Sequence, residues 1–239
     1  MASGKSLGEV INGRMYRGVL TGLNEAFIID QSTRDQMVKD DPTCATIIKP
    51  VLRGEDLRPW YQENEGHWLI FTRRGIDINA YPTIFLHLKR FQDQLEPRPD
   101  DWNSTDQWPG RKPGSYKWYE IQDSIDYYDA FEHPKILWPD ITKKPRFSWG
   151  EPGIYLGNTG YCVPTDSYAL LGILSSRTLW YILTCSSQPL GERAGALIYR
   201  LFRQYMERLP IPPLTDTQRE TIGTLAQQLT TTAKQRYAV

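Results

Sequence analysis

The segment that most constrains the fold of this chain is residues 97–118, which cannot form a regular helix or strand. It holds four prolines and two glycines. Proline lacks a backbone N–H donor, and glycine weakens the interior of both kinds of element. Three tryptophans, Trp102, Trp108 and Trp118, lie in the same segment and would be wasted in a disordered one. Because a long loop in a compact domain is usually functional or disordered, the sequence predicts a functional surface loop here.

Composition places the chain among ordinary globular proteins. Of its 239 residues, 40% are hydrophobic and 23% are charged, and 28 bases balance 28 acids. This zero net charge argues mildly against a dedicated nucleic-acid binder, which is usually basic. The charges are nevertheless sorted: residues 120–132 carry five acids and no base, residues 133–150 carry four bases and one acid, and residues 193–208 carry four arginines and one glutamate. An ordinary solvated surface does not require such sorting of charge into patches.

The cysteines and histidines show no spacing typical of a disulfide framework or a metal site. Three cysteines (Cys44, Cys162, Cys185) and three histidines (His67, His87, His133) are scattered along the chain. A reducing cytoplasm is therefore the expected compartment. The most apolar window, residues 168–185, has Arg177 near its middle. Because a central charge is costly in a bilayer, we expect a buried helix there and no membrane partner.

Apolar periodicity predicts an α+β fold without internal repeats. Residues 13–82 hold short runs rich in β-branched and aromatic residues, bounded by turn residues, which is typical of strands. Later segments show helical or strand patterns. The expected helices are 81–96, 119–131, 168–185, 195–210 and the segment after 213, and the expected strand and hairpin are 134–141 and 153–164.

Catalytic motifs are weak in this sequence. Neither G-x-G-x-x-G nor G-x-x-x-x-G-K-[ST] occurs, although a Gly-Lys-Ser stands at residues 4–6. Pro139-Asp140 is a fragment of a metal-dependent nuclease motif, but the acid-x-Lys that should follow is missing. Eight tryptophans and fourteen tyrosines leave an aromatic carbohydrate-binding module as another alternative, although core packing explains aromatics equally well.

Several stretches resemble a known family. "LPIPPLTDTQ" (209–218) is similar to the proline corner that closes target-recognition domains of restriction–modification specificity subunits. "RGVLTGLNEAFIID" (17–30) and "IIKPVLRGEDLRPW" (47–60) resemble the opening of the TaqI-like C-terminal specificity domain of type IIG restriction enzymes and related adenine-specific DNA methyltransferases. "FEHPKILWPDI" and "YALLGILSS" follow in that family's order, so the resemblance spans roughly residues 13–235.

The resemblance implies a domain plan. Residues 13–210 would be a single DNA target-recognition domain and residues 211–239 a C-terminal helix, and the "MASG" start makes residues 1–12 an expected expression remnant or linker. The Asn-Pro-Pro-Tyr motif and the glycine-rich loop of the methyltransferase part do not occur. The chain would therefore be a recognition module without its own cofactor, while the parent enzyme would use S-adenosylmethionine and possibly Mg²⁺. The implied partners are double-stranded DNA and the methyltransferase domain of the same parent protein.

Candidate DNA-binding residues are cations and amides in the expected loops, since arginine and lysine neutralise phosphates, arginine reads guanine, and Asn or Gln reads adenine. They are Arg73, Arg74, Asn103, Gln107, Arg111, Lys112, Lys117, Lys143, Lys144 and Arg146, with Arg74 and Arg111 as the first choices for base reading. The residues that match family motifs are expected to be mostly structural, with DNA contact by Asn24 as an alternative. They are Gly18, Thr21, Gly22, Asn24, Lys49, Arg53, Gly54, Pro210, Pro212, Pro213 and Gln218.

Overall fold

A computed structural model describes residues 4–237, and these divide into two compact units. Unit 1 contains residues up to 18, residues 52–65 and residues from 127 onward, whereas unit 2 contains residues 19–51 and 66–126. The chain thus crosses between the units several times. From the sequence we expected one recognition domain followed by a helix; within the structure the same residues form two compact units.

Unit 1 is built on an antiparallel sheet. Its strand order is β2 (Tyr16–Arg17), β10 (Gly160–Pro164), β6 (Lys135–Pro139) and β8 (Ser148–Gly150). The strand expected at 134–141 is confirmed as β6 followed by β7 (Ile141–Thr142). Ile136, Trp138 and Val163 from these strands are buried, and Trp138 Nε1 donates to the carbonyl of Leu201 at 3.0 Å. The sheet therefore supplies one side of the unit 1 core.

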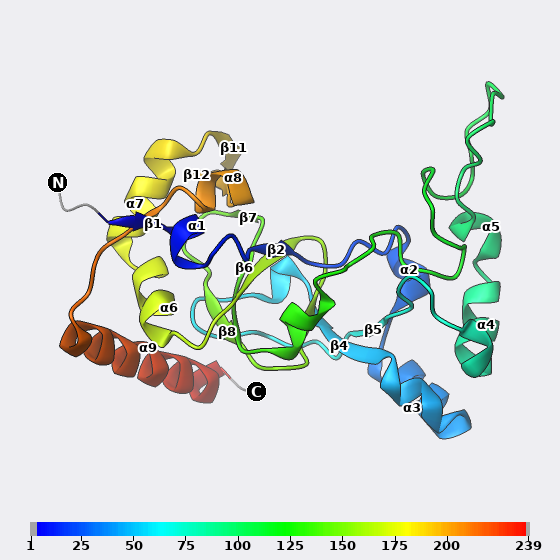
Figure 1. Cartoon of the computed structure of the whole chain (residues 1–239), viewed down its shortest axis with the longest axis horizontal. Coiled ribbons are helices and arrows are strands. Elements are labelled where there is room, and N and C mark those ends of the chain that lie inside the picture. The colour runs from blue at the N-terminus through cyan, green and yellow to red at the C-terminus, as the bar shows by residue number, and fades with distance from the viewer. Residues whose placement is uncertain (1–3, 238–239) are drawn as a thin grey trace. The chain divides into compact units, whose positions relative to one another are not determined.

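The helices of unit 1 cover this core. They are α1 (Leu7–Val10), α6 (Tyr168–Leu174), α7 (Arg177–Ser186), α8 (Arg203–Met206) and α9 (Asp216–Tyr237). The single helix expected at 168–185 is instead two, because Ser176 caps α7 by accepting a hydrogen bond from the Leu179 amide. The terminal helix is confirmed, and α9 lies against α6 so closely that a Cβ at Gly172 would approach Ile222 to 2.7 Å (Figure 1).

The N-terminal residues are part of unit 1 from Lys5 onward. Strand β1 (Lys5–Ser6) pairs antiparallel with β13 (Pro210–Ile211), and the side chain of Leu7 is fully buried. The segment 1–12, expected to be a remnant or linker, therefore packs into the core over the part that is described. Residues 1–3 lie outside the described residues.

Two of the expected helices do not form as predicted. Residues 189–200 form a hairpin of β11 (Pro189–Arg193) and β12 (Ala196–Arg200), whose second strand pairs with β7. Only the short helix α8 remains of the helix expected at 195–210. The expected helix at 119–131 is reduced to the 3₁₀ turn η4 (Tyr128–Glu132). The hairpin expected at 153–164 also differs: β9 (Tyr155–Leu156) precedes β10, but β10 pairs with β2 and β6.

Unit 2 combines short strands with helices. Strands β3 (Ile28–Ile29), β5 (Trp68–Ile70) and β4 (Ile48–Leu52) pair antiparallel in that order. The helices and 3₁₀ turns of unit 2 are α2 (Asn24–Phe27), α3 (Gln31–Asp40), η1 (Pro42–Thr46), η3 (Ile78–Ala80), α4 (Pro82–Lys89) and α5 (Gln92–Leu95). The 3₁₀ turn η2 (Gly54–Asp56) belongs to unit 1. The single helix expected at 81–96 is instead two, α4 and α5, with a turn at residues 90–91, whereas α2 and α3 were not expected.

The prediction of a long loop is confirmed. Residues 97–118 contain no helix or strand. An isolated parallel β-bridge joins Pro97 and Arg111 within this loop. The loop extends away from α4 and α5 in Figure 1. Trp108 Nε1 donates to the carbonyl of Glu96 at 3.0 Å, and Trp102 contacts the Trp108 ring edge-on with centroids 4.8 Å apart. Trp108 therefore holds its part of the loop to the end of α5, whereas Trp102 is 38% exposed and is not buried as its place in an ordered loop had suggested.

A fully buried lysine lies at the start of β6. The Lys135 ammonium donates to the carbonyls of Phe131, His133 and Glu151 at 2.7–2.9 Å. Burial lowers the pKa of Lys135 from the ordinary 10.5 to about 8. The three carbonyls replace the water that the ammonium loses, and this group ties η4 and the residue after β8 to the sheet.

Lys135 should make the stability of the protein rise with pH. Its pKa is about 8 when folded and 10.5 when unfolded, so the unfolded chain holds more protons between these values. The free energy of unfolding should gain up to about 3 kcal/mol over this window relative to a Lys135→Met variant. Urea titrations at pH 7.5 and 10 measure this difference. If the free energy of unfolding changed with pH in the same way in both proteins, the Lys135 ammonium would keep its proton up to pH 10 and the prediction would be wrong.

Candidate functional site

The turn at residues 21–24 fits around a buried arginine. Thr21 Oγ1 donates to Asn24 Oδ1 at 2.8 Å, and Gly22 has a left-handed φ of 87°. A Cβ at Gly22 would lie 2.5 Å from the Cδ of Arg111. Glycine is therefore required here both by its backbone conformation and by the close approach of Arg111. These contacts favour a structural role for the Thr-Gly-x-Asn stretch, and Asn24 itself is exposed.

The Arg111 guanidinium is surrounded by backbone carbonyls. It donates to Leu95, Thr21, Glu120 and Trp118 at 2.8–2.9 Å and to Lys117 at 3.3 Å. The residue is only 4% exposed, and burial lowers its pKa from 12.5 to about 10, so it stays charged at neutral pH. All five N–H donors of an arginine can be used in this way. The prediction that Arg111 reads a base therefore does not fit the structure, because its donors are occupied within unit 2.

Arg74 is also engaged within unit 2. Its guanidinium donates to the carbonyls of Ile121 and Gln122, and it lies 3.9 Å from the carboxylate of Glu120. That carboxylate is itself buried and accepts hydrogen bonds from the amides of Gly75 and Lys117. The same group of contacts thus holds residues 117–122 in place. Arg74 is therefore a weaker candidate for base reading than the sequence suggested.

The remaining candidates of unit 2 lie at its surface. Arg73, Asn103, Gln107, Lys112 and Lys117 are all exposed. Four of them belong to the 97–118 loop. The Lys117 ammonium lies 5.6 Å from the ring centroid of Tyr119, and a hydrogen bond to Tyr119 raises its pKa. The structure therefore brings an exposed set of cations and amides onto a loop that Arg111 and Trp108 fix to the body of unit 2.

The candidates of unit 1 follow β7. The Lys143 ammonium donates to the carbonyl of Arg193, and Lys144 is exposed. Arg146 is half-buried and donates to the carbonyl of Glu55 at 3.3 Å, and burial together with nearby Arg58 lowers its pKa. Lys143 and Lys144 therefore adjoin the β11–β12 hairpin, whereas Arg146 faces the body of unit 1.

Most family-motif residues have structural surroundings. A Cβ at Gly18 would lie 2.1 Å from the carbonyl oxygen of Gly157, and one at Gly54 would lie 2.3 Å from that of Thr159. The Arg53 guanidinium pairs with acids of unit 1, Asp56 at 3.0 Å among them. Two further residues form a capping box at α9, where the Thr215 amide donates to Gln218 Oε1 at 3.0 Å and the Gln218 amide to Thr215 Oγ1 at 3.2 Å. Lys49 is half-buried, and Pro210, Pro212 and Pro213 are exposed.

Sequence reasoning missed the hairpin arginines. Arg193 and Arg200 are exposed on β11 and β12, next to Lys143. The signal was present as the run of four arginines between residues 193 and 208. It was not used for DNA recognition because the segment was expected to be a helix.

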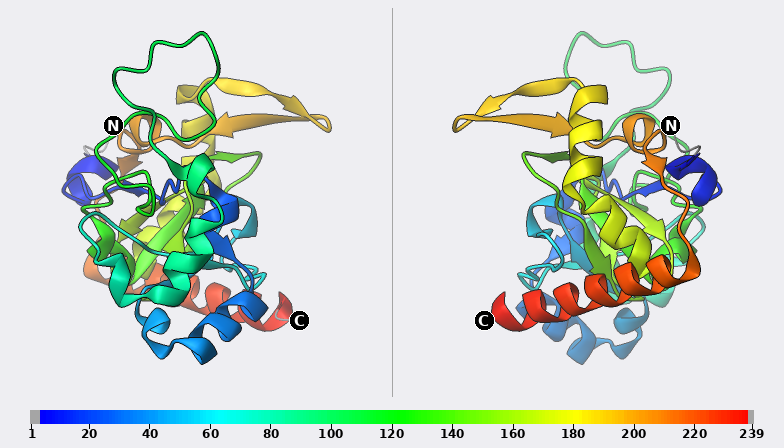
Figure 2. Two further views of the ribbon diagram at one scale, coloured as in Figure 1. Left: turned by 90° about the vertical axis from the view of Figure 1, so that its right-hand side faces the viewer. Right: turned by 90° about the vertical axis from the view of Figure 1, so that its left-hand side faces the viewer.

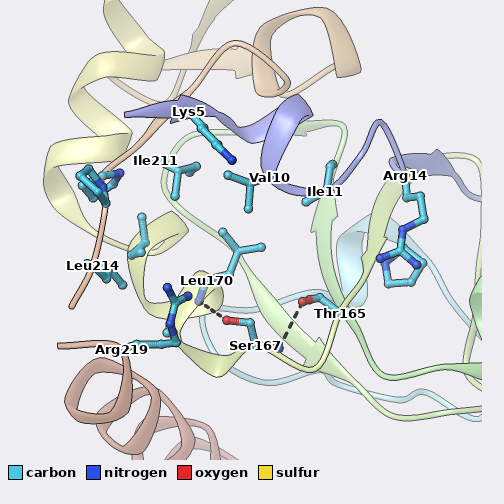
Figure 3. A pocket seen from close by; sticks show the side chains of 15 residues that line it. Lys5, Val10, Ile11, Arg14, Thr165, Ser167, Leu170, Ile211, Leu214 and Arg219 are labelled. Atoms are coloured by element: carbon cyan, nitrogen blue, oxygen red, sulfur yellow. Dashed lines mark hydrogen bonds between the residues drawn. The ribbon is translucent and has the colours of Figure 1, made fainter. Parts of the chain in front are cut away.

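A cavity of about 480 Å³ lies elsewhere in unit 1 (Figure 3). Its lining is apolar where Ile11, Leu170 and Ile211 meet, and Lys5, Arg14 and Arg219 add positive charge. No predicted DNA-binding residue lines it. Ser167, also in the lining, is occupied because its hydroxyl accepts from the Leu170 amide and its amide donates to Thr165 Oγ1.

The nuclease alternative finds no support in the described residues. Asp140 has a pKa raised by burial and lies 4.0 Å from Arg17. Among residues 4–237 no group of three or more His, Cys, Asp and Glu side chains is placed to hold a metal ion. No helix within the same range is long and apolar enough to cross a membrane.

The comparisons with known proteins identify the family. The model of the TaqI-like C-terminal specificity domain matches residues 49–211, and the chain belongs to this family. It is 22% identical over 232 residues to the type II methyltransferase M.BanIII of Aneurinibacillus aneurinilyticus, a match that covers 89% of this chain and 37% of that protein. The chain thus spans little more than a third of this curated relative.

Two solved structures share the fold. The type IIL restriction-modification enzyme MmeI, in complex with DNA, matches 99% of this chain and 30% of its own, with a TM-score of 0.62 and 16% identity. The type IIG restriction endonuclease BpuSI matches 94% of this chain and 26% of its own, with a TM-score of 0.52 and 12% identity. At these identities the likeness concerns the fold.

Removing the buried guanidinium should unfold unit 2 more easily. Arg111→Met leaves several buried carbonyls without donors, so we expect the free energy of unfolding to fall by about 3 kcal/mol. Urea denaturation followed by tryptophan fluorescence measures the change. Lys112→Ala is the matched control, since an exposed neighbour should cost less than about 0.5 kcal/mol. Equal stability of the two variants would contradict the anchoring role of Arg111.

Proposed function

We propose that this chain is the sequence-specific DNA target-recognition module of a restriction–modification enzyme of the type IIG or adenine-methyltransferase kind. The observation that carries the proposal is membership of the TaqI-like C-terminal specificity domain family, matched over residues 49–211. The MmeI structure supports it, since that enzyme shares the fold and was determined in complex with DNA. Neither the nuclease nor the carbohydrate-binding alternative has a comparable observation in its favour.

The surface chemistry agrees with this proposal. The exposed Lys112, Lys117 and Lys144 are suited to phosphates, and Asn103 and Gln107 carry the amide groups that pair bidentately with adenine. Most of these residues belong to the 97–118 loop, which Trp108 and Arg111 attach to unit 2, and Lys144 follows β7 of unit 1. An ordered loop loses less conformational entropy on binding DNA, which favours affinity. The zero net charge of the whole chain is compatible with DNA binding, because its basic residues are concentrated in patches.

Catalysis belongs, in this proposal, to other parts of the parent protein. This chain corresponds to only part of the enzymes it resembles, 37% of M.BanIII and 30% of MmeI. We infer that S-adenosylmethionine, and Mg²⁺ if the parent also cleaves DNA, are bound outside this module. The methyltransferase domain of the same protein would then be its second partner and would supply part of the phosphate binding. The isolated chain should therefore bind DNA weakly.

Salt dependence tests the proposed DNA contact by the unit 2 loop. Log affinity for a duplex should fall against log salt with a slope of about −3 to −5, which corresponds to a few neutralised phosphates. Replacing Lys112 and Lys117 by alanine should make this slope shallower by up to about 2 without changing sequence preference. Fluorescence anisotropy over several salt concentrations measures it.

Lys39→Ala provides the control, because Lys39 is an exposed lysine of unit 2 on α3, outside the loop. A wild-type chain that binds no duplex at about 50 mM salt, where phosphate contacts are strong, would contradict the proposed function. A slope that the loop variant leaves unchanged would place the phosphate contacts elsewhere.

A further inference from the structure

The β11–β12 hairpin extends from unit 1 as a two-stranded ribbon, which Figure 2 shows in both views. Its turn consists of Ala194 and Gly195, with φ values of 50° and 69°. Positive φ at both central residues is the geometry of a tight type I′ hairpin turn. The ribbon is therefore a defined element with a narrow tip, although it carries only one short supporting strand, β7, at its base.

The outer part of the ribbon has little core to stabilise it. All five residues of β11 are exposed, and Leu190 and Leu197 are 41% and 47% exposed. The base is held by Tyr199, whose ring meets Trp180 edge-on with centroids 5.7 Å apart. Since an isolated two-stranded hairpin is only marginally stable in water, its extension beyond the core indicates a role in contacting something else.

One face of the ribbon is basic. Residues directly opposite each other share a face, and Arg193 pairs with Ala196 while Arg200 pairs with Ile141 of β7. Ala196 and Arg200 are four positions apart on β12, so both arginines project from the same face. Tyr199, which packs on the core, and Leu197, which pairs with Glu192, belong to the opposite face. The acid of the ribbon is thus separated from its arginines.

Neighbouring lysines extend this positive charge. The Lys143 ammonium donates to the carbonyl of Arg193, which leaves other N–H donors of the ammonium for a ligand. Lys144 next to it is exposed. The guanidinium of Arg193 makes no hydrogen bond or ion pair with any residue between 4 and 237, so its bidentate donors are available.

We propose that this ribbon enters the major groove of duplex DNA, where Arg193 reads a base edge and Arg200 and Lys143 contact phosphates. A two-stranded β-ribbon fits the width of the major groove, and arginine there pairs bidentately with guanine. The inference rests on the proposed function, and it adds a base-reading element that lies outside the 97–118 loop. The Arg193 guanidinium lies at the ribbon tip with the Lys143 ammonium beside it, and Arg200 lies at the base where β12 pairs with β7, which matches a division between base reading and backbone contact.

Arginine and lysine substitutions separate the two kinds of contact. The probes are a labelled duplex that the wild-type chain selects from a randomised pool, and a scrambled duplex of equal length. Arg193→Ala should weaken binding to the selected duplex about 5- to 150-fold and leave the scrambled duplex within about threefold. Arg193→Lys should lose nearly as much, because lysine keeps the charge but not the planar fork.

Arg200→Ala should weaken both duplexes alike and make the salt slope shallower by about 0.9. Arg219→Ala is the matched control, since Arg219 is an exposed arginine of unit 1 on α9, away from the ribbon. It should bind both duplexes like the wild type. Circular dichroism melting checks that each variant is folded.

The outcomes distinguish this inference from the proposed function. If the wild-type chain discriminates between the duplexes and both Arg193 variants retain that discrimination, the ribbon does not read DNA, while the proposed function stands. If the wild-type chain binds no duplex, both fail. If Leu190→Ser with Leu197→Ser converts a dimer into a monomer and leaves DNA affinity unchanged, the ribbon is a contact between copies of the chain and the inference is overturned.

Discussion

The ordered surface of unit 2 depends on the guanidinium of Arg111. It joins the end of α5, the turn at Thr21 and residues 117–120 by donating to carbonyls of all three segments. A buried charge is costly unless it is fully hydrogen-bonded, and here backbone carbonyls satisfy that requirement. One side chain thus joins segments far apart in the sequence, and it holds Arg111 itself and residues 117–118 of the proline-rich loop against the body of unit 2.

The element of unit 1 that we propose to read DNA is stabilised in a different way. The β11–β12 hairpin forms a three-stranded sheet with β7 at its base. Backbone hydrogen bonds between β11 and β12 hold the two strands of the hairpin together. Unit 1 also has a buried cation that is similar to Arg111. The Lys135 ammonium donates to backbone carbonyls of separate segments, as the Arg111 guanidinium does. Both buried cations are thus structural, whereas the cations assigned to DNA lie on elements that rise above the core. Burial therefore distinguishes structural cations from exposed ones, a distinction that the sequence alone does not make.

Local signals explain which predictions from the sequence were confirmed. The capping box of Thr215 and Gln218 fixes the start of α9, and the prolines of 97–118 exclude regular structure. Residues 196–200 were expected to be helical because apolar side chains at 197, 198, 201, 202 and 205 fit a helical period. These residues form a strand instead, because a tight turn at Ala194-Gly195 reverses the chain and β12 pairs with β7. Pairing with a strand distant in the sequence leaves no signal in the local pattern of apolar residues. The burial of Arg111 was hidden for the same reason, since its acceptors include a carbonyl 90 residues away.

Hydrogen–deuterium exchange of the whole chain, with and without a selected duplex, tests the central claim most directly because it reports every segment in one experiment. The account predicts slower exchange in two places, at residues 112–118 of the unit 2 loop and at residues 190–198 of the β11–β12 hairpin. It predicts no change along the solvent-facing part of α9 or around the 480 Å³ cavity. Slower exchange confined to α9 or to the cavity, with both recognition segments unchanged, would contradict it.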